Sequence, residues 1–107
     1  SAATIIRTAL PESVTKKLPR YTEFPATLLG RLARDLQFKG ERMGDRLLAS
    51  MVHRAVMTSQ EVASWAIVTD PIDEYARQFY ESFGFQPLTS DRLFLTMRQA
   101  ADWLSAR

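Results

Sequence analysis

The feature that most constrains this chain is an amphipathic helix followed directly by an apolar strand. Apolar residues recur through 47–56 at helical spacing, while polar residues, His53 among them, fall on the opposite side. Residues 63–69 then form a compact apolar run of strand length. A helix that feeds a strand in this way is typical of a crossover unit, so the pattern predicts an α/β or α+β domain.

The length and composition predict one small globular domain spanning residues 1–107. A hydrophobic share of 46% and a charged share of 24% exclude a disordered tail or a fibrous repeat. The absence of cysteine excludes a disulfide scaffold, thiolate metal sites and a cysteine nucleophile. Because His53 is the single histidine and falls on the polar side of its helix, we expect a surface residue and no metal site. The lack of a long apolar stretch or a secretory pattern predicts a cytoplasmic protein without a membrane segment.

Basic side chains gather in the first half of the chain. Residues 7–54 hold ten Lys and Arg against five Asp and Glu, whereas residues 55–107 hold four against seven. This asymmetry suits an anionic ligand such as phosphate or nucleic acid, although a difference of this size is more often a solvated surface.

Three elements are predicted before the amphipathic helix. Residues 3–8 form a β-branched run typical of a strand, and residues 11–18 favour a brief helix that begins with proline. Residues 28–34 have the apolar density of a second strand, with Gly30 as a possible bulge, and the segment between is predicted to be a connector.

The C-terminal half is predicted to hold a second main helix and a hairpin. Asp70 and Pro71 supply an N-cap and a first helical residue, residues 75–83 carry an apolar stripe, and Gly84 is predicted to be a left-handed C-cap. The remaining predicted elements are strands at 85–88 and 93–97, a turn at 89–91 and a terminal helical turn or two at 100–104.

A glycine-containing turn at residues 37–44 leads into the amphipathic helix. Such a turn exposes backbone N–H groups at the positive end of the helix dipole, where phosphate oxygens bind well. Its spacing is too short for a Walker loop and lacks the GxGxxG pattern, so an NTPase or a dinucleotide-binding protein is not indicated. The alternative is an ordinary strand-to-helix turn with a solvated basic rim.

The order of these elements, together with residues 76–85, resembles the C-terminal two-thirds of the GNAT N-acetyltransferase superfamily. Residues 17–21 and 28–33 look like the branch of GNAT toxins that acetylate aminoacyl-tRNA. The resemblance covers residues 3–97 and implies a truncated GNAT fold of the α+β (α/β-like) class. We therefore expect a mixed, mostly antiparallel sheet of about five strands with two main helices. The family's first strand, two following helices and second strand have no counterpart here, so residues 3–8 should form an exposed sheet edge.

The resemblance implies an acetyl-CoA loop within residues 39–44. The family pattern Q/R-x-x-G-x-G/A places Lys39 first, Arg42 fourth and Gly44 sixth, so that Arg42 stands where glycine is expected. A side chain there either blocks the approach of the backbone to the pyrophosphate or pairs with a phosphate. A second register, starting at Gln37, makes Gly40 the fourth residue but loses the sixth and fits the following leucines less well. The predicted cofactor-binding residues are Leu32, Ala33, Lys39, Gly40, Arg42, Met43, Gly44 and Phe79.

Residues 76–85 are similar to the family's A-x-x-F-Y-x-x-x-G-F signature, in which the tyrosine lies beside the CoA sulfur. The resemblance therefore implies that Tyr80 is the catalytic general acid. An amine would attack the thioester carbonyl, a backbone amide would polarise the oxygen, and the departing thiolate would take a proton from tyrosine. The alternative is that Phe79, Tyr80 and Phe83 simply fill the core, and this interpretation is preferred for the two phenylalanines.

The leading hypothesis is an acetyl-CoA-dependent N-acetyltransferase that acts on a primary amine, with aminoacyl-tRNA as the substrate implied by the resemblance. Arg20, Arg31 and Arg34 are weaker candidates for contacts to RNA phosphates. The resemblance also implies a homodimer and a ribbon-helix-helix antitoxin of a toxin-antitoxin pair. One alternative is a catalytically degenerate GNAT-like binding or dimerisation module, which Arg42 and the missing front part favour. Another is a nucleic-acid-binding domain without catalysis.

Overall fold

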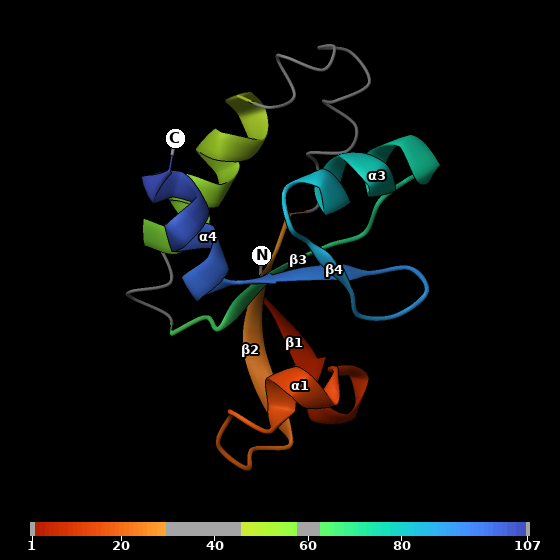
Figure 1. The fold of residues 1–107 in the computed structure, drawn as a ribbon, viewed down its shortest axis with the longest axis vertical. Coiled ribbons are helices and arrows are strands. Elements are labelled where there is room, and N and C mark those ends of the chain that lie inside the picture. The colour runs from red at the N-terminus through yellow and green to blue at the C-terminus, as the bar shows by residue number, and fades with distance from the viewer. Residues whose placement is uncertain (1, 30–45, 58–62, 107) are drawn as a thin grey trace.

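A five-stranded mixed sheet forms the centre of the molecule (Figure 1). The computed structural model describes residues 2–29, 46–57 and 63–106. The strands lie in the order β1-β2-β3-β5-β4, with β2 and β3 parallel and the other neighbours antiparallel. Their bounds are Ala2–Ile6 for β1, Glu23–Leu28 for β2, Ala66–Thr69 for β3, Gln86–Pro87 for β4 and Leu93–Thr96 for β5. The predicted fold class is confirmed.

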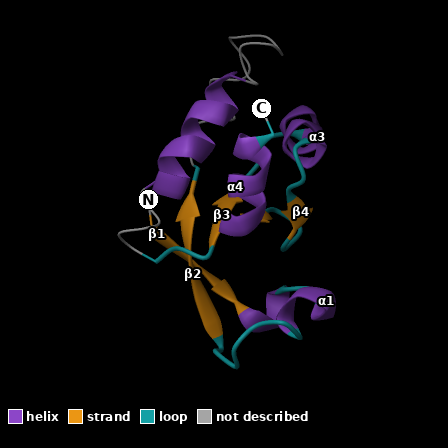
Figure 2. Cartoon of the chain, turned by 60° about the vertical axis from the view of Figure 1, so that its left-hand side comes forward, coloured by secondary structure: helices purple, strands orange, loops and turns teal. Residues whose placement is uncertain are grey.

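Helices cover both faces of this sheet. The short α1, Glu12–Thr15, follows a 3-10 turn at Arg7–Ala9 and lies at one end of the molecule (Figure 2). The longer helices are residues 46–57, α3 at Glu74–Ser82 and α4 at Met97–Ser105. They lie together at the other end, as both views show.

The alternation of side chains along the strands produces two separate buried clusters. On β3, Ile67 belongs to the cluster under the longer helices, whereas Ala66 and Val68 belong to the cluster beside α1. On β5, Leu93 and Leu95 face the longer helices and Phe94 faces the other side. Because both faces of β3 are covered, all of its residues are buried, and this explains its continuous apolar sequence.

The predicted helix after residue 44 is confirmed over residues 46–57. Leu48, Val52 and Ala55 are buried in the cluster under the longer helices, and His53 is exposed as expected from its place on the polar side. The predicted C-terminal hairpin is also confirmed, with Leu88 N–H donating to the Arg92 carbonyl at 2.8 Å across its turn.

A strand that the sequence did not predict lies at Glu23–Leu28, mostly within the predicted connector. It includes Leu28 of the strand predicted at 28–34, and residues 30–34 lie outside the described residues. Pro25 explains why the strand was missed, because proline usually argues against a strand interior. Here the Pro25 carbonyl accepts from the Trp65 N–H at 2.8 Å, so the backbone of Pro25 faces the β3 side. The missing N–H of Pro25 therefore leaves the β1–β2 ladder intact.

The first strand is shorter than predicted, because the chain turns into the 3-10 helix at Arg7. Within the described residues β1 pairs with β2 alone and forms one edge of the sheet, as expected. At the other end of the chain, α4 is longer than the predicted turn or two. Thr96 and Gln99 form a capping box at its start, which satisfies the free N–H groups of the first turn.

The start of α3 was also predicted wrongly. Its N-cap is Asp73, whose carboxylate accepts from the Ala76 N–H at 2.8 Å, and not Asp70. Asp70 instead accepts two hydrogen bonds from the Arg92 guanidinium, at 2.6 and 2.8 Å. This bidentate ion pair joins the end of β3 to the start of β5, and the chain needs three more residues before α3 begins.

Candidate active site

Tyr80 lies on α3 with its side chain fully enclosed. Its ring packs edge-on against Phe79 and Phe85, with centroids 5.9 and 5.3 Å away. Phe79 is 9% exposed and also contacts Phe83 at 4.9 Å between ring centroids. An aromatic cluster therefore fixes the orientation of the Tyr80 ring.

The end of α3 is determined by a Schellman motif. The Gly84 N–H donates to the Glu81 carbonyl at 3.0 Å and the Phe85 N–H donates to the Tyr80 carbonyl at 3.3 Å. Gly84 has φ of +104°, which confirms the predicted left-handed C-cap. Phe85 then turns back onto Tyr80, the hydrophobic contact that accompanies this motif.

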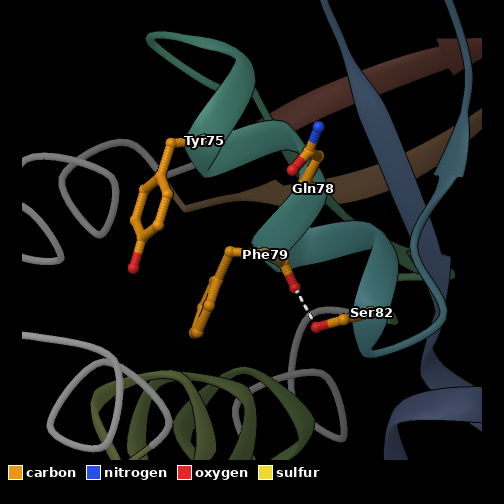
Figure 3. A pocket seen from close by; sticks show the side chains of 4 residues that line it. All are labelled: Tyr75, Gln78, Phe79 and Ser82. Carbon is orange, nitrogen blue, oxygen red and sulfur yellow. Dashed lines mark hydrogen bonds between the residues drawn. The ribbon is translucent and has the colours of Figure 1, made fainter.

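A small pocket of about 160 Å³ lies along α3, lined by Tyr75, Gln78, Phe79 and Ser82. Figure 3 shows Tyr75 and Phe79 pointing the same way from α3, toward the side of the helix at residues 46–57. The Ser82 hydroxyl donates to the Phe79 carbonyl at 2.6 Å. Tyr75 is 52% exposed, so the pocket combines one shielded aromatic ring with one accessible ring and a side-chain amide. Such a lining fits an extended ligand that carries both apolar and amide groups.

The helix that lines the pocket, α3, follows the carboxyl end of β3, one of the two parallel strands. Beyond β2, Leu29 donates its N–H to the Val68 carbonyl at 2.9 Å, and the Thr69 hydroxyl is 3.5 Å from the Leu29 carbonyl oxygen. The chain then leaves β2 toward residues 30–45 and leaves β3 toward α3. In sheets with parallel strands, ligands bind outside these carboxyl ends, so this is the edge where a cofactor site is expected.

The Asp70–Arg92 ion pair lies in the loops that follow β3 and precede β5. The hydrogen bonds from Arg92 hold the pKa of the Asp70 carboxyl below its ordinary value, and Asp70 in turn raises the pKa of Arg92. Both side chains are partly exposed. The pair therefore orients the loop between β3 and α3 without placing a buried charge in the site.

Of the predicted site residues, the structure places Tyr80 and Phe79 together on α3. Arg20 lies in the segment that links α1 and β2, at the opposite end of the molecule from α3 (Figure 1), so these residues are not brought together. The other predicted residues lie outside the described part of the chain: Arg31, Leu32, Ala33, Arg34, Lys39, Gly40, Arg42, Met43 and Gly44.

Sequence reasoning did not single out Tyr75, Gln78 or Ser82 as pocket residues. Their spacing of three and four residues puts them on one face of α3 with Phe79, and this periodicity was the available signal. No group of His, Asp and Glu able to hold a metal ion occurs in the described residues. No helix among the described residues has the length and apolar character needed to cross a membrane.

Comparisons with known proteins relate this fold to bacterial toxins, although no family model matches the chain. The chain is 31% identical over 87 residues to a tRNA-acetylating toxin of Mycobacterium tuberculosis. The matched segment covers 81% of this chain and 51% of that toxin. A tyrosine-to-phenylalanine variant of KacT superposes with a TM-score of 0.83 at 27% identity, covering 95% of this chain and 62% of KacT. The chain belongs to the KacT/AtaT family of GNAT-type toxins.

Solved structures of AtaT show which molecules AtaT binds. AtaT complexed with acetyl-methionyl-tRNA matches with a TM-score of 0.76 at 30% identity, covering 94% of this chain and 61% of AtaT. AtaT has also been solved with the C-terminus of its antitoxin AtaR, and AtaTR with acetyl-CoA. The chain thus spans about half the length of the curated relative and about three-fifths of the solved ones.

Proposed function

We propose that this chain is an acetyl-CoA-dependent N-acetyltransferase that transfers an acetyl group to the primary amine of an aminoacyl-tRNA. The observation that carries the proposal is the placement of Tyr80 on α3, after the carboxyl end of β3, in a fold shared with KacT and AtaT. A tRNA acceptor would place the reaction in the cytoplasm.

The pocket on α3 supports the proposal that acetyl-CoA, the acetyl donor, binds beside this helix. Acetyl-CoA carries a pantetheine arm that alternates methylene and amide groups, and when bound it supplies an activated acetyl thioester. Phe79 offers an apolar surface to such an arm and the Gln78 side chain offers an amide hydrogen-bonding group. Lys39, Arg42 and the backbone of residues 39–44 are the groups proposed for its phosphates.

Tyr80 would supply the proton that the departing thiolate takes up, and the attacking amine releases one proton in turn, so that the reaction consumes no net proton. When the amine nitrogen bonds to the acetyl carbon, the carbon–sulfur bond breaks and a thiolate departs. The phenol hydroxyl of tyrosine is protonated at neutral pH, so it can donate to that sulfur. The Schellman motif and the contact with Phe85 hold the ring in one orientation for the transfer. Solved structures of KacT and of AtaT carry a tyrosine-to-phenylalanine change, which removes one tyrosine hydroxyl from each protein.

A second candidate function is a catalytically degenerate GNAT-like binding or dimerisation module. The complete enclosure of Tyr80 favours it, because a general acid must reach the reacting sulfur. Arg42 at a position where the family expects glycine favours it as well.

The test is acetyl transfer from radiolabelled acetyl-CoA to methionyl-tRNA, with uncharged tRNA as the control acceptor. Transfer to the charged tRNA alone supports the enzyme. Binding of acetyl-CoA without transfer to either RNA would support the degenerate module.

Partners of the chain follow from the same family membership. The AtaT–AtaR complex supports a small antitoxin as partner, and the resemblance to GNAT toxins implies a ribbon-helix-helix protein. The exposed edge of β1 supports pairing with a second copy in a homodimer. Light scattering of the purified chain measures this state directly, and a monomeric mass at micromolar concentration would contradict the dimer.

A further inference from the structure

A second, larger pocket lies between α1 and the start of α4, away from the pocket on α3. It has a volume of about 420 Å³. It is lined by Ser13, Val14, Lys17, Leu18, Trp65, Thr96 and Arg98. None of these residues belongs to the candidate active site.

The floor of this pocket is apolar and held in place. Val14, Leu18 and Trp65 are partly buried and pack against the cluster on the α1 side of the sheet. The Trp65 ring lies 5.2 Å from Phe24 and 6.2 Å from Phe94 between centroids. Neighbouring aromatic rings therefore fix the indole and leave only part of it open to a ligand.

The rim of the pocket is cationic. Lys17 and Arg98 are exposed, and the lining that the described residues provide includes no acidic side chain. Within the described part of the chain the ion pairs are Arg77–Glu81 and Arg92–Asp70, so neither rim cation is neutralised there. Two such cations beside an apolar floor suit an anion that also carries a flat apolar group.

The segment that carries Lys17 is tied down by a partly exposed hydrogen-bond network around Arg7. The Arg7 guanidinium donates to the carbonyls of Thr15 at 2.8 Å and Tyr21 at 3.3 Å, and also to that of Pro19. A segment fixed in this way loses little conformational entropy when it binds a ligand.

We propose that this pocket binds one nucleotide of an RNA strand, with Lys17 and Arg98 on its phosphate and the base against Leu18 and Trp65. A basic stretch extends beyond the pocket: residues 13–22, which lie between Glu12 and Glu23, contain three Lys or Arg and no Asp or Glu. Tyr21, 64% exposed, adds an aromatic ring to it. An extended polyanion contacts all of these groups, whereas a single carboxylate reaches one or two. The choice of RNA rests on the proposed function.

The test is fluorescence anisotropy of a labelled 12-nucleotide single-stranded RNA, titrated with the full chain at several salt concentrations. Each lost phosphate contact should reduce the slope of log K against log salt by about 0.7. If the variant and the unchanged chain bind equally at 1 M salt, the variant then binds about fivefold more weakly at 0.1 M salt. Because both cations are proposed to contact one phosphate, we expect the double variant of Lys17→Gln and Arg98→Gln to show this loss and each single variant to show part of it. Arg54→Gln is the matched control, because Arg54 is equally exposed but lies on the helix of residues 46–57.

Contact of the base with Trp65 on the pocket floor is measured separately, by tryptophan fluorescence. The chain has two tryptophans, so in a Trp103→Phe variant the emission reports on Trp65 alone. RNA should quench this emission in proportion to binding. Unchanged emission at saturation would overturn the contact between base and indole.

Three other results would overturn the proposal. One is an unchanged salt slope in the double variant, and another is an equal loss in Arg54→Gln. The third is a poly-glutamate peptide of matched charge that competes as well as RNA, since the surface would then select charge alone. Titration of acetyl-CoA into the same samples separates the two proposals. If the unchanged chain binds acetyl-CoA but no RNA, the pocket proposal is overturned; if it binds RNA but no acetyl-CoA, the acetyltransferase proposal is overturned.

Discussion

Phe85 holds Tyr80 twice, once through the backbone and once through its ring. Its N–H donates to the Tyr80 carbonyl at 3.3 Å, and the two ring centroids lie 5.3 Å apart. The geometry depends on Gly84, because φ of +104° turns the chain so that Phe85 returns to α3. The residue proposed for catalysis is thus positioned by the residue that ends its helix.

Replacing Gly84 with alanine should destabilise the protein by about 1–2 kcal/mol, because an L-residue is strained at positive φ. A Cβ at this position would meet only Leu95 Cδ1, at the ordinary contact distance of 3.8 Å, so the cost is conformational and not a clash. Urea denaturation followed by circular dichroism measures it. Gly84→Asn should lose less, since asparagine tolerates left-handed backbone better, and equal losses in the two variants would contradict this explanation.

Replacing Tyr80 with phenylalanine should lower kcat for acetyl transfer about 100-fold, the usual range for loss of a general acid. The acetyl-CoA Kd should stay the same, because only the hydroxyl is removed. Single-turnover kinetics and calorimetry together separate these two quantities. Unchanged turnover would remove Tyr80 from the mechanism and leave it a role in the core.

The proposed acetyl-CoA loop at 39–44 can be tested at Arg42, which stands where the GNAT pattern has glycine. We expect the chain to bind acetyl-CoA and Arg42→Gly to weaken this about tenfold, because a charge-assisted hydrogen bond to phosphate is lost. Isothermal titration of acetyl-CoA into both proteins measures the difference. If glycine instead restored binding to a chain that otherwise bound nothing, Arg42 would be the lesion of a degenerate module.

The Asp70–Arg92 pair should make stability depend on acid pH. The Asp70 pKa is lowered from 3.8 in the folded protein, so the contribution is fully present above that value. It is lost as pH falls from 3.8 through the lower folded pKa. Because both side chains are partly exposed, the loss should not exceed about 1 kcal/mol. Denaturation of the protein and of Arg92→Met at pH 2–7 checks this, and parallel curves for the two would refute it.

Periodicity predicted the elements whose pattern is set by one dominant face. The helix at residues 46–57, α3 and the β4–β5 hairpin were found in this way, because each buries a regular apolar stripe or ends at a recognisable turn. The start of α3 was misplaced since Asp70 and Asp73 both suit an N-cap, and only the tertiary contact with Arg92 distinguishes them. The extent of α4 was underestimated although Thr96 and Gln99 carry the spacing of a capping box.

The candidate site was predicted in part for a similar reason. Tyr80 and Phe79 could be placed on one helix because their motif is local in sequence. The pocket with Tyr75 and Ser82 depends on how α3 sits against other elements, which no local pattern specifies. The pocket beside Trp65 joins residues near 15 to residues near 97, so sequence spacing gave no sign of it.

The parallel pairing of β2 with β3 also has a consequence for how the chain folds. It pairs Ala26 with Ala66, which lies 40 positions later in the sequence, whereas α3 and the β4–β5 hairpin form from neighbouring segments. Closing so long a loop costs entropy before any strand contact is gained. Docking of β1 and β2 onto β3 is therefore expected to be the late, rate-limiting event, and the edge of β3 opposite β5 stays unpaired until it occurs.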